Sequence, residues 1–166
     1  MVEEKGLEEK NLGRQSSGRM KIEGTRGYMA PEFQGSGIVT QKCDVYAFGV
    51  VVLELVSGED ALRYYFDEER GEYRRVSVID RAREALAAGE GGVRKWVDRR
   101  LRDSFPVKVA EKMILLGLEC VEADPGKRPE MARIVVRVSK YYLESKNWAK
   151  SIGGMPTDFS VSVAPR

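Results

Sequence analysis

The sequence predicts a mainly helical fold, and three observations favour it. The 166 residues are 42% hydrophobic and 33% charged, which is typical of one soluble globular domain or of a piece of one. Apolar residues are concentrated in residues 40–58 and recur at helical spacing in residues 107–121 and 128–145. Alternation of apolar and polar residues, the mark of a half-buried strand, is convincing nowhere in the chain. We therefore expect packed helices.

The segment that precedes the first long helix carries few apolar residues. Residues 1–23 are polar and lack a sustained period, which predicts a mobile segment. Residues 24–37 are rich in Gly and Pro and predict an ordered loop, with Pro31 near the start of a short helical turn.

Two serines in the first segment, Ser16 and Ser17, lie between Arg14 and Arg19. Composition alone leaves two interpretations open. One is a solvated loop, and the other is a phosphorylation segment whose added negative charge would pair with the nearby guanidinium groups.

Residues 40–58 predict a central helix that is apolar on every side and hence buried. Thr40 can cap its start, and Gly58 stands where a left-handed residue ends a helix. The segment is too short to cross a bilayer and carries Glu54 in its middle. Asp44 lies in its first turn, where a buried carboxylate requires hydrogen-bond donors.

Residues 59–76 are charged and aromatic and predict a surface excursion. Their Arg and Tyr residues suggest RNA contact, but interleaved acidic residues cancel the positive field, so we expect a solvated insertion. A short amphipathic helix follows at residues 77–88, capped by Ser77 and ended by the glycine-rich residues 89–92.

Two further helices complete the predicted core, separated by a turn at residues 123–126. In the helix at residues 107–121 the expected buried side consists of Val109, Met113, Leu116, Leu118 and Cys120. In the last helix, from Arg128 to about Ser145, the expected inward residues are Met131, Ile134, Val135, Val138 and Leu143. Residues 147–166 turn Gly/Ser/Pro-rich and predict a disordered tail.

Charge and cysteine content exclude several classes of partner. The net charge of +2, from 28 Lys and Arg against 26 Asp and Glu, gives no reason to expect nucleic acid or membrane as the main partner. Cys43 and Cys120 are the only cysteines and the chain has no histidine, so we expect no metal site and two unpaired core thiols. With no signal peptide or transmembrane segment, the chain has a cytoplasmic character.

Four motifs occur in an order and at spacings that together are very specific: GTRGYMAPE, KCDVYAFGVVVLELVSG, WVDRRL and LGLECVEADPGKRPEM. They resemble the C-terminal lobe of a plant receptor-like Ser/Thr protein kinase over residues 24–145. The ending, KNWAKSIG and then SVSVAPR, is similar to the tails of LysM-type receptor kinases. The resemblance implies three parts: an activation segment and substrate-docking loop (1–39), the helical core of the lobe (40–146) and a disordered tail (147–166), with the N-terminal lobe absent.

The resemblance implies architectural roles for three residues. Glu32, which closes Ala-Pro-Glu, matches a carboxylate that pairs with a buried arginine in kinases, and Arg128 in KRPEM matches that arginine. A bidentate pair of this kind can anchor a loop to a helix pair. Asp44 matches the aspartate of the central helix that hydrogen-bonds the backbone of the catalytic loop. None of the three does chemistry in the family.

The same resemblance places the substrate-docking loop at Thr25, Gly27 and Tyr28. Thr25 matches the threonine whose hydroxyl reaches the catalytic aspartate of Ser/Thr kinases, and Gly27 and Tyr28 belong to the loop that receives the substrate peptide. Ser16 and Ser17 stand where activation-loop phosphorylation occurs. Ser16, Ser17 and Thr25 are therefore the candidate phosphosites.

Phosphoryl transfer in this family uses ATP and Mg²⁺, and the motifs that hold them are missing from the sequence. Transfer requires a Gly-rich phosphate cover, a strand lysine paired with a helix glutamate, a His-Arg-Asp loop and Asp-Phe-Gly. The chain has no histidine and no Val-Ala-Ile-Lys strand, and Asp158-Phe159-Ser160 is only superficially similar to Asp-Phe-Gly. We assign no catalytic, cofactor-binding or metal residue and expect no phosphoryl transfer by this chain alone.

Three functions are compatible with these features. The chain is part of a Ser/Thr kinase, or a non-catalytic scaffold or competitor that binds another kinase or its substrate, or a remnant that does not fold stably. The position of Met1 within an activation loop favours truncation. The expected partners are a protein substrate or a partner kinase, with membrane contact only through a missing upstream segment that would hold the chain at the cytoplasmic face of the plasma membrane. Without a catalytic loop, we expect Asp44 to lack its donors and one strip of the central helix to stay uncovered, which predicts a marginal, aggregation-prone fold.

Overall fold

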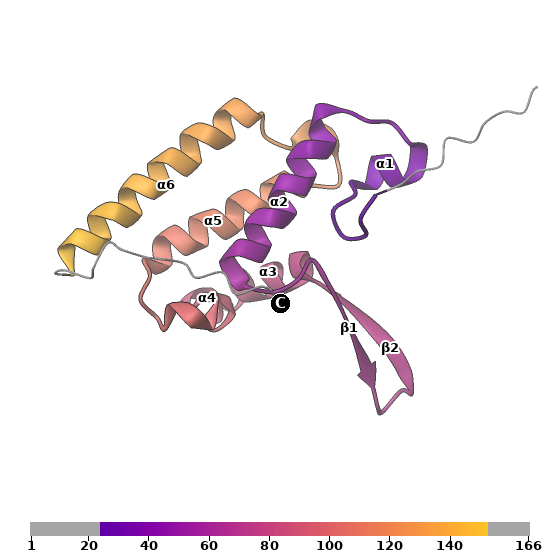
Figure 1. The fold of residues 1–166 in the computed structure, drawn as a ribbon, viewed down its shortest axis with the longest axis horizontal. Coiled ribbons are helices and arrows are strands. Elements are labelled where there is room, and N and C mark those ends of the chain that lie inside the picture. Colours follow the sequence, from indigo (N-terminus) through magenta and orange to yellow (C-terminus); the bar gives the residue numbers. More distant parts are fainter. Residues whose placement is uncertain (1–23, 153–166) are drawn as a thin grey trace, which may run out of the picture.

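Helix α2 (Gln41–Ser57) runs through the middle of the molecule, and the other elements are arranged around it (Figure 1). The computed structural model describes residues 24–152. Both predicted ends of the helix are confirmed. The Thr40 hydroxyl accepts a hydrogen bond from the backbone N–H of Lys42 (3.2 Å), and Gly58 ends the helix at a φ of 69°.

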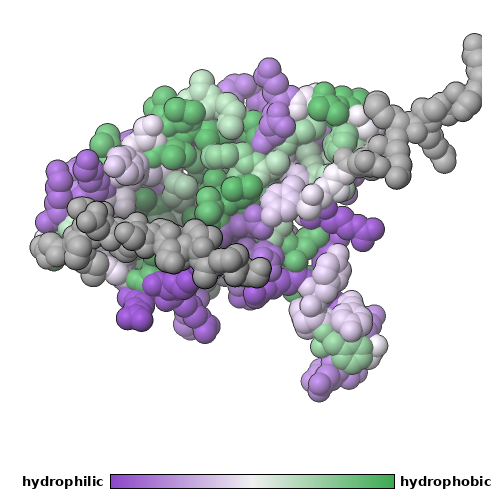
Figure 2. Space-filling view, in the orientation of Figure 1, coloured by the Kyte–Doolittle hydropathy of each residue, from purple (hydrophilic) through white to green (hydrophobic). Residues whose placement is uncertain are grey.

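One strip of α2 remains uncovered by the residues that the structure describes. Val50 and Leu53 are fully buried, whereas Val51 is 40% and Leu55 is 76% exposed. The prediction of a helix buried on all sides is wrong for this strip, and the uncovered strip expected from the missing catalytic loop is present. Figure 2 shows apolar side chains gathered over α2 and α6 (Met131–Ser151) on the face turned to the viewer.

Helix α5 (Val107–Cys120) packs most closely against α2, and two glycines make the close approach possible. A Cβ atom at Gly49 would lie 2.6 Å from the Cβ of Cys120 and 2.8 Å from the carbonyl oxygen of Gly117. At Gly117, a Cβ atom would lie 2.8 Å from Leu53 Cδ2. The helix backbones therefore approach one another where neither helix carries a side chain.

The core consists of two clusters, both built on the α2–α5 pair. The first joins Val50, Leu53 and Ile114 to α3 (Val78–Ala87) and α4 (Gly89–Trp96). The second joins α2 and α5 to α6, and its buried members are Val45, Leu116, Cys120, Ile134 and Tyr141. Cys43 and Cys120 are both free thiols, as the sequence predicted, but only Cys120 lies in the core, because Cys43 is half-buried in the first turn of α2.

Residues 89–92 form a helix where the sequence predicted only the end of one. The Ser77 hydroxyl caps α3 as predicted, accepting from the N–H of Ile79 at 3.1 Å. The glycines that follow then begin α4, because Val93 and Trp96 turn apolar side chains into the first cluster and hold this second helix in place. Burial of two side chains thus outweighs the weak helix propensity of glycine.

Residues 62–77 form an antiparallel β-hairpin, which the sequence analysis missed. Strand β1 (Leu62–Asp67) pairs with β2 (Glu72–Ser77) from Leu62 opposite Ser77 to Asp67 opposite Glu72. The prediction of a surface excursion is correct, because the four central residues of β1 are exposed. Since neither face of the hairpin is buried along most of its length, the sequence carries no apolar alternation to mark the strands.

Helix α6 turns a different face to the core from the predicted one. Ile134 is buried, Val138 packs against the second cluster, and Tyr141 is buried in place of Leu143. Met131, Val135 and Leu143, all predicted inward, are 44–61% exposed. The helix packs against the second cluster along a narrow seam of Ile134, Val138 and Tyr141, so many of its other apolar residues remain exposed.

The sequence predicted the buried side of α5 well but placed the end of α6 too early. On α5, Leu116 and Cys120 are buried as predicted, and Val109, Met113 and Leu118 are partly buried. Helix α6 continues to Ser151, beyond the predicted end near Ser145. The rest of the predicted tail, residues 153–166, lies outside the described residues. None of the helices within residues 24–152 combines the length and the apolar character needed to span a membrane.

The remaining elements are short: α1 (Pro31–Ser36), η1 (Arg99–Leu101) and η2 (Pro125–Lys127). Helix α1 begins at Pro31 as predicted and ends at Gly37, which has a φ of 71°. The turn predicted at residues 123–126 leads into η2, whose start is capped by the Asp124 side chain. The segment that contains η2 contacts α2, and Arg128, which directly follows η2, pairs with Glu32 of α1 (Figure 1 shows the arrangement of these elements).

Candidate functional site

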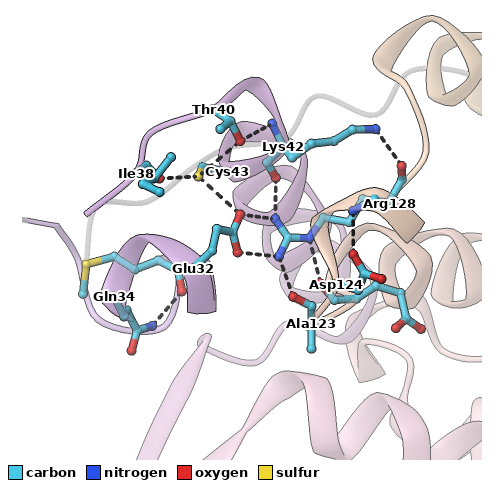
Figure 3. Close-up of polar contacts among 12 residues, drawn as sticks. Glu32, Gln34, Ile38, Thr40, Lys42, Cys43, Ala123, Asp124 and Arg128 are labelled. Atoms are coloured by element: carbon cyan, nitrogen blue, oxygen red, sulfur yellow. Dashed lines mark hydrogen bonds and ion pairs between the residues drawn. The ribbon is translucent and has the colours of Figure 1, made fainter. Parts of the chain in front are cut away.

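Arg128 is the most deeply buried charged residue of the described chain, at 2% exposure, and every N–H of its guanidinium has an acceptor. Nη1 donates to Glu32 Oε1 at 2.7 Å and to the carbonyl of Lys42 at 2.8 Å. Nη2 donates to Glu32 Oε2 at 2.8 Å and to the carbonyl of Ala123 at 3.4 Å, and Nε donates to the carbonyl of Glu122 at 2.7 Å. Figure 3 shows this fork lying between α1, α2 and the chain before η2.

Residues around the pair tie the same three segments together. Lys42 Nζ donates to the carbonyl of Arg128 at 2.7 Å and pairs with Glu130 at 2.6 Å. The thiol of Cys43 donates to Glu32 Oε1 at 3.4 Å, and the guanidinium of Arg128 lies 5.0 Å from the centre of the Tyr46 ring. The pair expected from the sequence is therefore present, and α2 contributes to it through Lys42, Cys43 and Tyr46.

The hydrogen bonds from Arg128 lower the pKa of Glu32 from 4.5 to about 2, against an opposing effect of burial. A carboxylate so held stays ionised at any physiological pH. Because the arginine is fully enclosed, loss of the carboxylate charge would leave a buried cation without its partner, which is far more costly than breaking an exposed ion pair.

The pair predicts a defined loss of stability in acid. Because the folded-state pKa of Glu32 is depressed, its stabilisation is complete above the ordinary pKa of 4.5 and is lost as the pH falls toward about 2. The full effect corresponds to about 3 kcal/mol of unfolding free energy. Urea unfolding of the wild type and of Glu32→Gln across this window should give two free energies that converge in acid. A difference between them that stays constant with pH would contradict the assignment.

The loop before α1 is fixed by a second contact, between Tyr28 and α2. The Tyr28 hydroxyl donates to both carboxylate oxygens of Glu54, at 2.7 and 2.8 Å, and Glu54 also accepts the N–H of Ala61 at 2.7 Å. The hydrogen bond to Glu54 raises the pKa of Tyr28 to about 12. These contacts explain why a carboxylate occurs within an apolar helix. Glu54 joins the loop before α1 to the start of the hairpin.

Gly27 occupies a position that only glycine fits. Its φ is 100°, and a Cβ atom there would lie 3.0 Å from the Cβ of Ala61 and 3.1 Å from Leu62 Cγ. Beside it, the N–H of Tyr28 donates to the carbonyl of Thr25 at 3.2 Å and closes a turn. The loop therefore follows the base of the hairpin, with Thr25 exposed to solvent.

Thr25, Tyr28 and Asp44 border one open hollow of about 350 Å³ between the loop and the start of α2. Met29 and Phe33 provide much of its apolar wall. Asp44 is exposed, and its carboxylate accepts no hydrogen bond from any of residues 24–152. Its charge lies in the first turn of α2, where the helix dipole favours an anion.

The residues of the hollow do not fit a nucleotide site. Phosphate groups require cations or converging N–H donors, whereas the hollow is bordered by the Asp44 carboxylate and by neither Lys nor Arg. A divalent ion requires several oxygen ligands, and the described part of the chain contains no cluster of three His, Cys, Asp or Glu side chains that could hold one. The chemistry of this hollow therefore does not fit ATP with Mg²⁺.

The structure groups the residues singled out from the sequence into two neighbouring sets. Glu32 and Arg128 form the anchor, and Thr25, Tyr28 and Asp44 border the hollow, with Cys43 touching both. Ser16 and Ser17 lie outside the described residues. Sequence reasoning missed Glu54 as the partner of Tyr28. The signal was available, because a carboxylate within an apolar helix demands a donor.

Comparison with known proteins gives the family. The profile of the protein kinase domain matches residues 8–138. The chain belongs to the protein kinase domain family. Among its relatives are plant receptor-like kinases: LysM domain receptor-like kinase 3 of Arabidopsis thaliana is 32% identical over 153 residues, covering 88% of this chain and 23% of the relative.

Two further relatives widen this picture. The probable LRR receptor-like serine/threonine-protein kinase IRK of Arabidopsis thaliana is 42% identical over 116 residues, covering 69% of this chain and 11% of the relative. The inactive protein kinase SELMODRAFT_444075 of Selaginella moellendorffii is 34% identical over 153 residues, covering 90% of this chain and 26% of the relative. The chain thus spans about a quarter or less of the length of these relatives. Its helical fold is that of the C-terminal lobe, as the sequence predicted.

Proposed function

We propose that this chain is the substrate-docking part of a receptor-like Ser/Thr kinase domain and transfers no phosphate by itself. The observation that carries the proposal is the enclosed Arg128, which fixes the Ala-Pro-Glu turn to α2 and η2 through Glu32. The anchor at Glu32 and the Tyr28–Glu54 contact hold residues 25–37 at two points, and in this proposal the segment presents its outer side to a protein substrate.

Each residue of the loop has a role in this proposal that needs no reacting group. Arg128 and Glu32 position the turn, Tyr28 holds the loop to α2, and Gly27 permits its path along the hairpin base. Thr25 lies exposed in the loop and is a candidate phosphosite with Ser16 and Ser17. Phosphate added there would bring two negative charges and new acceptors to a segment that contains Arg14, Arg19 and Arg26.

The complete protein, in this proposal, transfers the γ-phosphate of ATP to Ser or Thr of a protein substrate at the cytoplasmic face of the plasma membrane. The support is the kinase domain match and relatives named as receptor-like and as serine/threonine kinases. That a relative of similar coverage is named an inactive kinase supports the part of the proposal that concerns this chain.

A non-catalytic scaffold or competitor is the second candidate. The observation that favours it is the uncovered strip of α2, because Val51 and Leu55 offer an apolar surface beside the anchored loop. Such a chain would bind another kinase or its substrate and act by occupying that surface.

Incubation of the purified chain with ATP, Mg²⁺ and a generic protein acceptor tests the absence of transfer. We expect no phosphate incorporation above the level of a chain-free reaction, because the motifs that hold ATP and Mg²⁺ in the family are missing from the sequence. A complete receptor-like kinase domain assayed beside it is the positive control. Incorporation that rises in proportion to the amount of chain would contradict the proposal.

Adding an active receptor-like kinase domain separates the two candidates. The docking proposal predicts phosphate on Ser16, Ser17 or Thr25, located by mass spectrometry. The competitor predicts that acceptor phosphorylation falls as the chain is added, with these three residues unmodified. In that second outcome, Leu55→Lys should restore acceptor phosphorylation.

A further inference from the structure

The β-hairpin is exposed along most of its length. It extends away from the helical body, with its tip clear of the helices (Figure 1). Its sheet has two strands, so within residues 24–152 the outer edge of each strand has no strand partner. A lone two-stranded hairpin is at best marginally stable in water, and a free edge is a template for pairing with another strand.

The side chains of the hairpin are those of an interaction surface. Tyr64, Phe66 and Tyr73 share one face and are 51–74% exposed, and the rings of Phe66 and Tyr73 meet edge to face at 5.2 Å. Tyr65 lies on the other face and is 45% exposed. Aromatic residues at this density are enriched in protein interfaces and are seldom left exposed as a group.

The sequence of β1 is complementary to itself in antiparallel pairing. In a pair of β1 strands related by a twofold axis at Tyr65, Arg63 of each copy faces Asp67 of the other. In the same register Tyr64 of each copy faces Phe66 of the other, and the two Tyr65 residues face each other. Opposite residues in antiparallel strands share a face, and all of these pairs satisfy that condition. We propose that two copies of this chain associate edge to edge through β1, forming a continuous four-stranded sheet.

Within residues 24–152, Arg63 of the hairpin has a free charge to offer, whereas Asp67 is 15% exposed and already has weak partners. Arg63 makes no ion pair with any residue of the described range, and the ion pair of Asp67 with Arg74 is long, at 3.6 Å. Asp67 also accepts the N–H of Arg70 at 3.2 Å, which fixes the start of the turn. The second carboxylate oxygen carries the long contact with Arg74, so an incoming arginine would compete with Arg74 there and leave the hydrogen bond from Arg70 intact.

The edge of β2 does not offer an equivalent arrangement. A twofold axis at Arg74 or at Arg75 would place two arginines directly opposite each other. An axis at Tyr73 pairs Glu72 with Arg74 but overlaps only residues 72–74. The β1 edge therefore gives the longer overlap and the better charge match. Because the contact involves only residues 63–67 of each copy, the association is weak and depends on concentration.

Sedimentation velocity of the full chain over a concentration series tests the proposal, with circular dichroism to show that each variant keeps its helices. The wild type should form a discrete dimer as concentration rises. In Arg63→Glu, the new carboxylate of each copy faces Asp67 of the other copy, so the dimer contains two pairs of like charges. This variant should raise the dissociation constant roughly tenfold or more. Asp67→Lys should do the same through two pairs of cations. An equimolar mixture of the two variants should restore the dimer, because the introduced carboxylate of one variant then faces the introduced ammonium group of the other.

The control variant is Arg75→Glu, which makes the same change of charge on the other strand and should leave the dimer intact. A wild type that stays monomeric at every concentration would overturn the proposal. So would association that Arg63→Glu leaves unchanged, since that result would place the contact elsewhere. Failure of the mixture to restore the dimer would also overturn it. None of these outcomes bears on phosphate transfer, so the proposal stands or falls independently of the kinase assignment.

Discussion

Replacing Arg128 with alanine is expected to lower the free energy of unfolding by roughly 3–5 kcal/mol, because it breaks a buried ion pair and leaves Glu32 and three backbone carbonyls without their donor. An ordinary domain has only about 5–15 kcal/mol in total, so much of the variant should be unfolded at neutral pH. Urea unfolding followed by circular dichroism measures the loss. Arg128→Lys should recover little of it, since an ammonium group cannot make the forked contact.

Arg137→Ala is the matched control for this experiment. Arg137 also pairs with a glutamate, Glu119, but the two side chains are 31% and 46% exposed. Exposed ion pairs contribute at most about 1 kcal/mol, so this variant should remain close to the wild type. Equal losses in the two alanine variants would show that enclosure of Arg128 has no special effect and would contradict the account of the anchor.

Replacing Gly49 with alanine is expected to destabilise the fold by about 1–3 kcal/mol or more, because the added methyl group overlaps α5. Its Cβ would lie 2.8 Å from a backbone oxygen and 2.9 Å from Val121 Cγ1, besides its contact with Cys120. Backbone atoms cannot turn aside as a flexible side chain can, so the helices must separate. Thermal and urea unfolding should both move to milder conditions.

Gly35→Ala is the control for the change of glycine to alanine itself. Gly35 lies in α1, and a Cβ atom there would meet nothing within 4 Å. Alanine is favoured over glycine in a helix by about 0.5–1 kcal/mol, so this variant should be slightly more stable than the wild type. Similar destabilisation in both variants would show that the loss of a glycine, and not a clash between α2 and α5, lowers the stability. That result would contradict the account of the helix crossing.

The features that could be predicted from the sequence are those that depend on residues close together in the chain. Thr40, Ser77 and Gly58 fix helix ends through contacts within a few positions, and the structure has these ends where they were expected. The Glu32–Arg128 pair, which joins residues 96 positions apart, was located only because two family motifs are recognisable in the sequence. No local rule would have joined them.

What was missed depends on contacts between distant segments. The hairpin carries no alternation because its faces meet solvent, and α4 begins with glycines because Trp96 and Val93 are held by the first core cluster. The face that α6 turns inward is decided by its narrow seam with α5, not by the distribution of its own apolar residues. Likewise, the role of Glu54 as a hydrogen-bond acceptor becomes visible only when the folded loop brings Tyr28 to it.

Amide hydrogen exchange in α1 tests the central claim, that the Glu32–Arg128 pair holds the loop that carries α1 to the helical body. The reporters are the N–H groups of Gln34 and Gly37, which donate to the carbonyls of Ala30 and Phe33. In Glu32→Gln at neutral pH, the account predicts that these amides exchange up to roughly a hundredfold faster, while those of α5 keep more of their protection. Glu119→Gln, the exposed counterpart, should change neither. Unchanged exchange in α1 of Glu32→Gln would contradict the account, because the loop would then be held by something other than this pair.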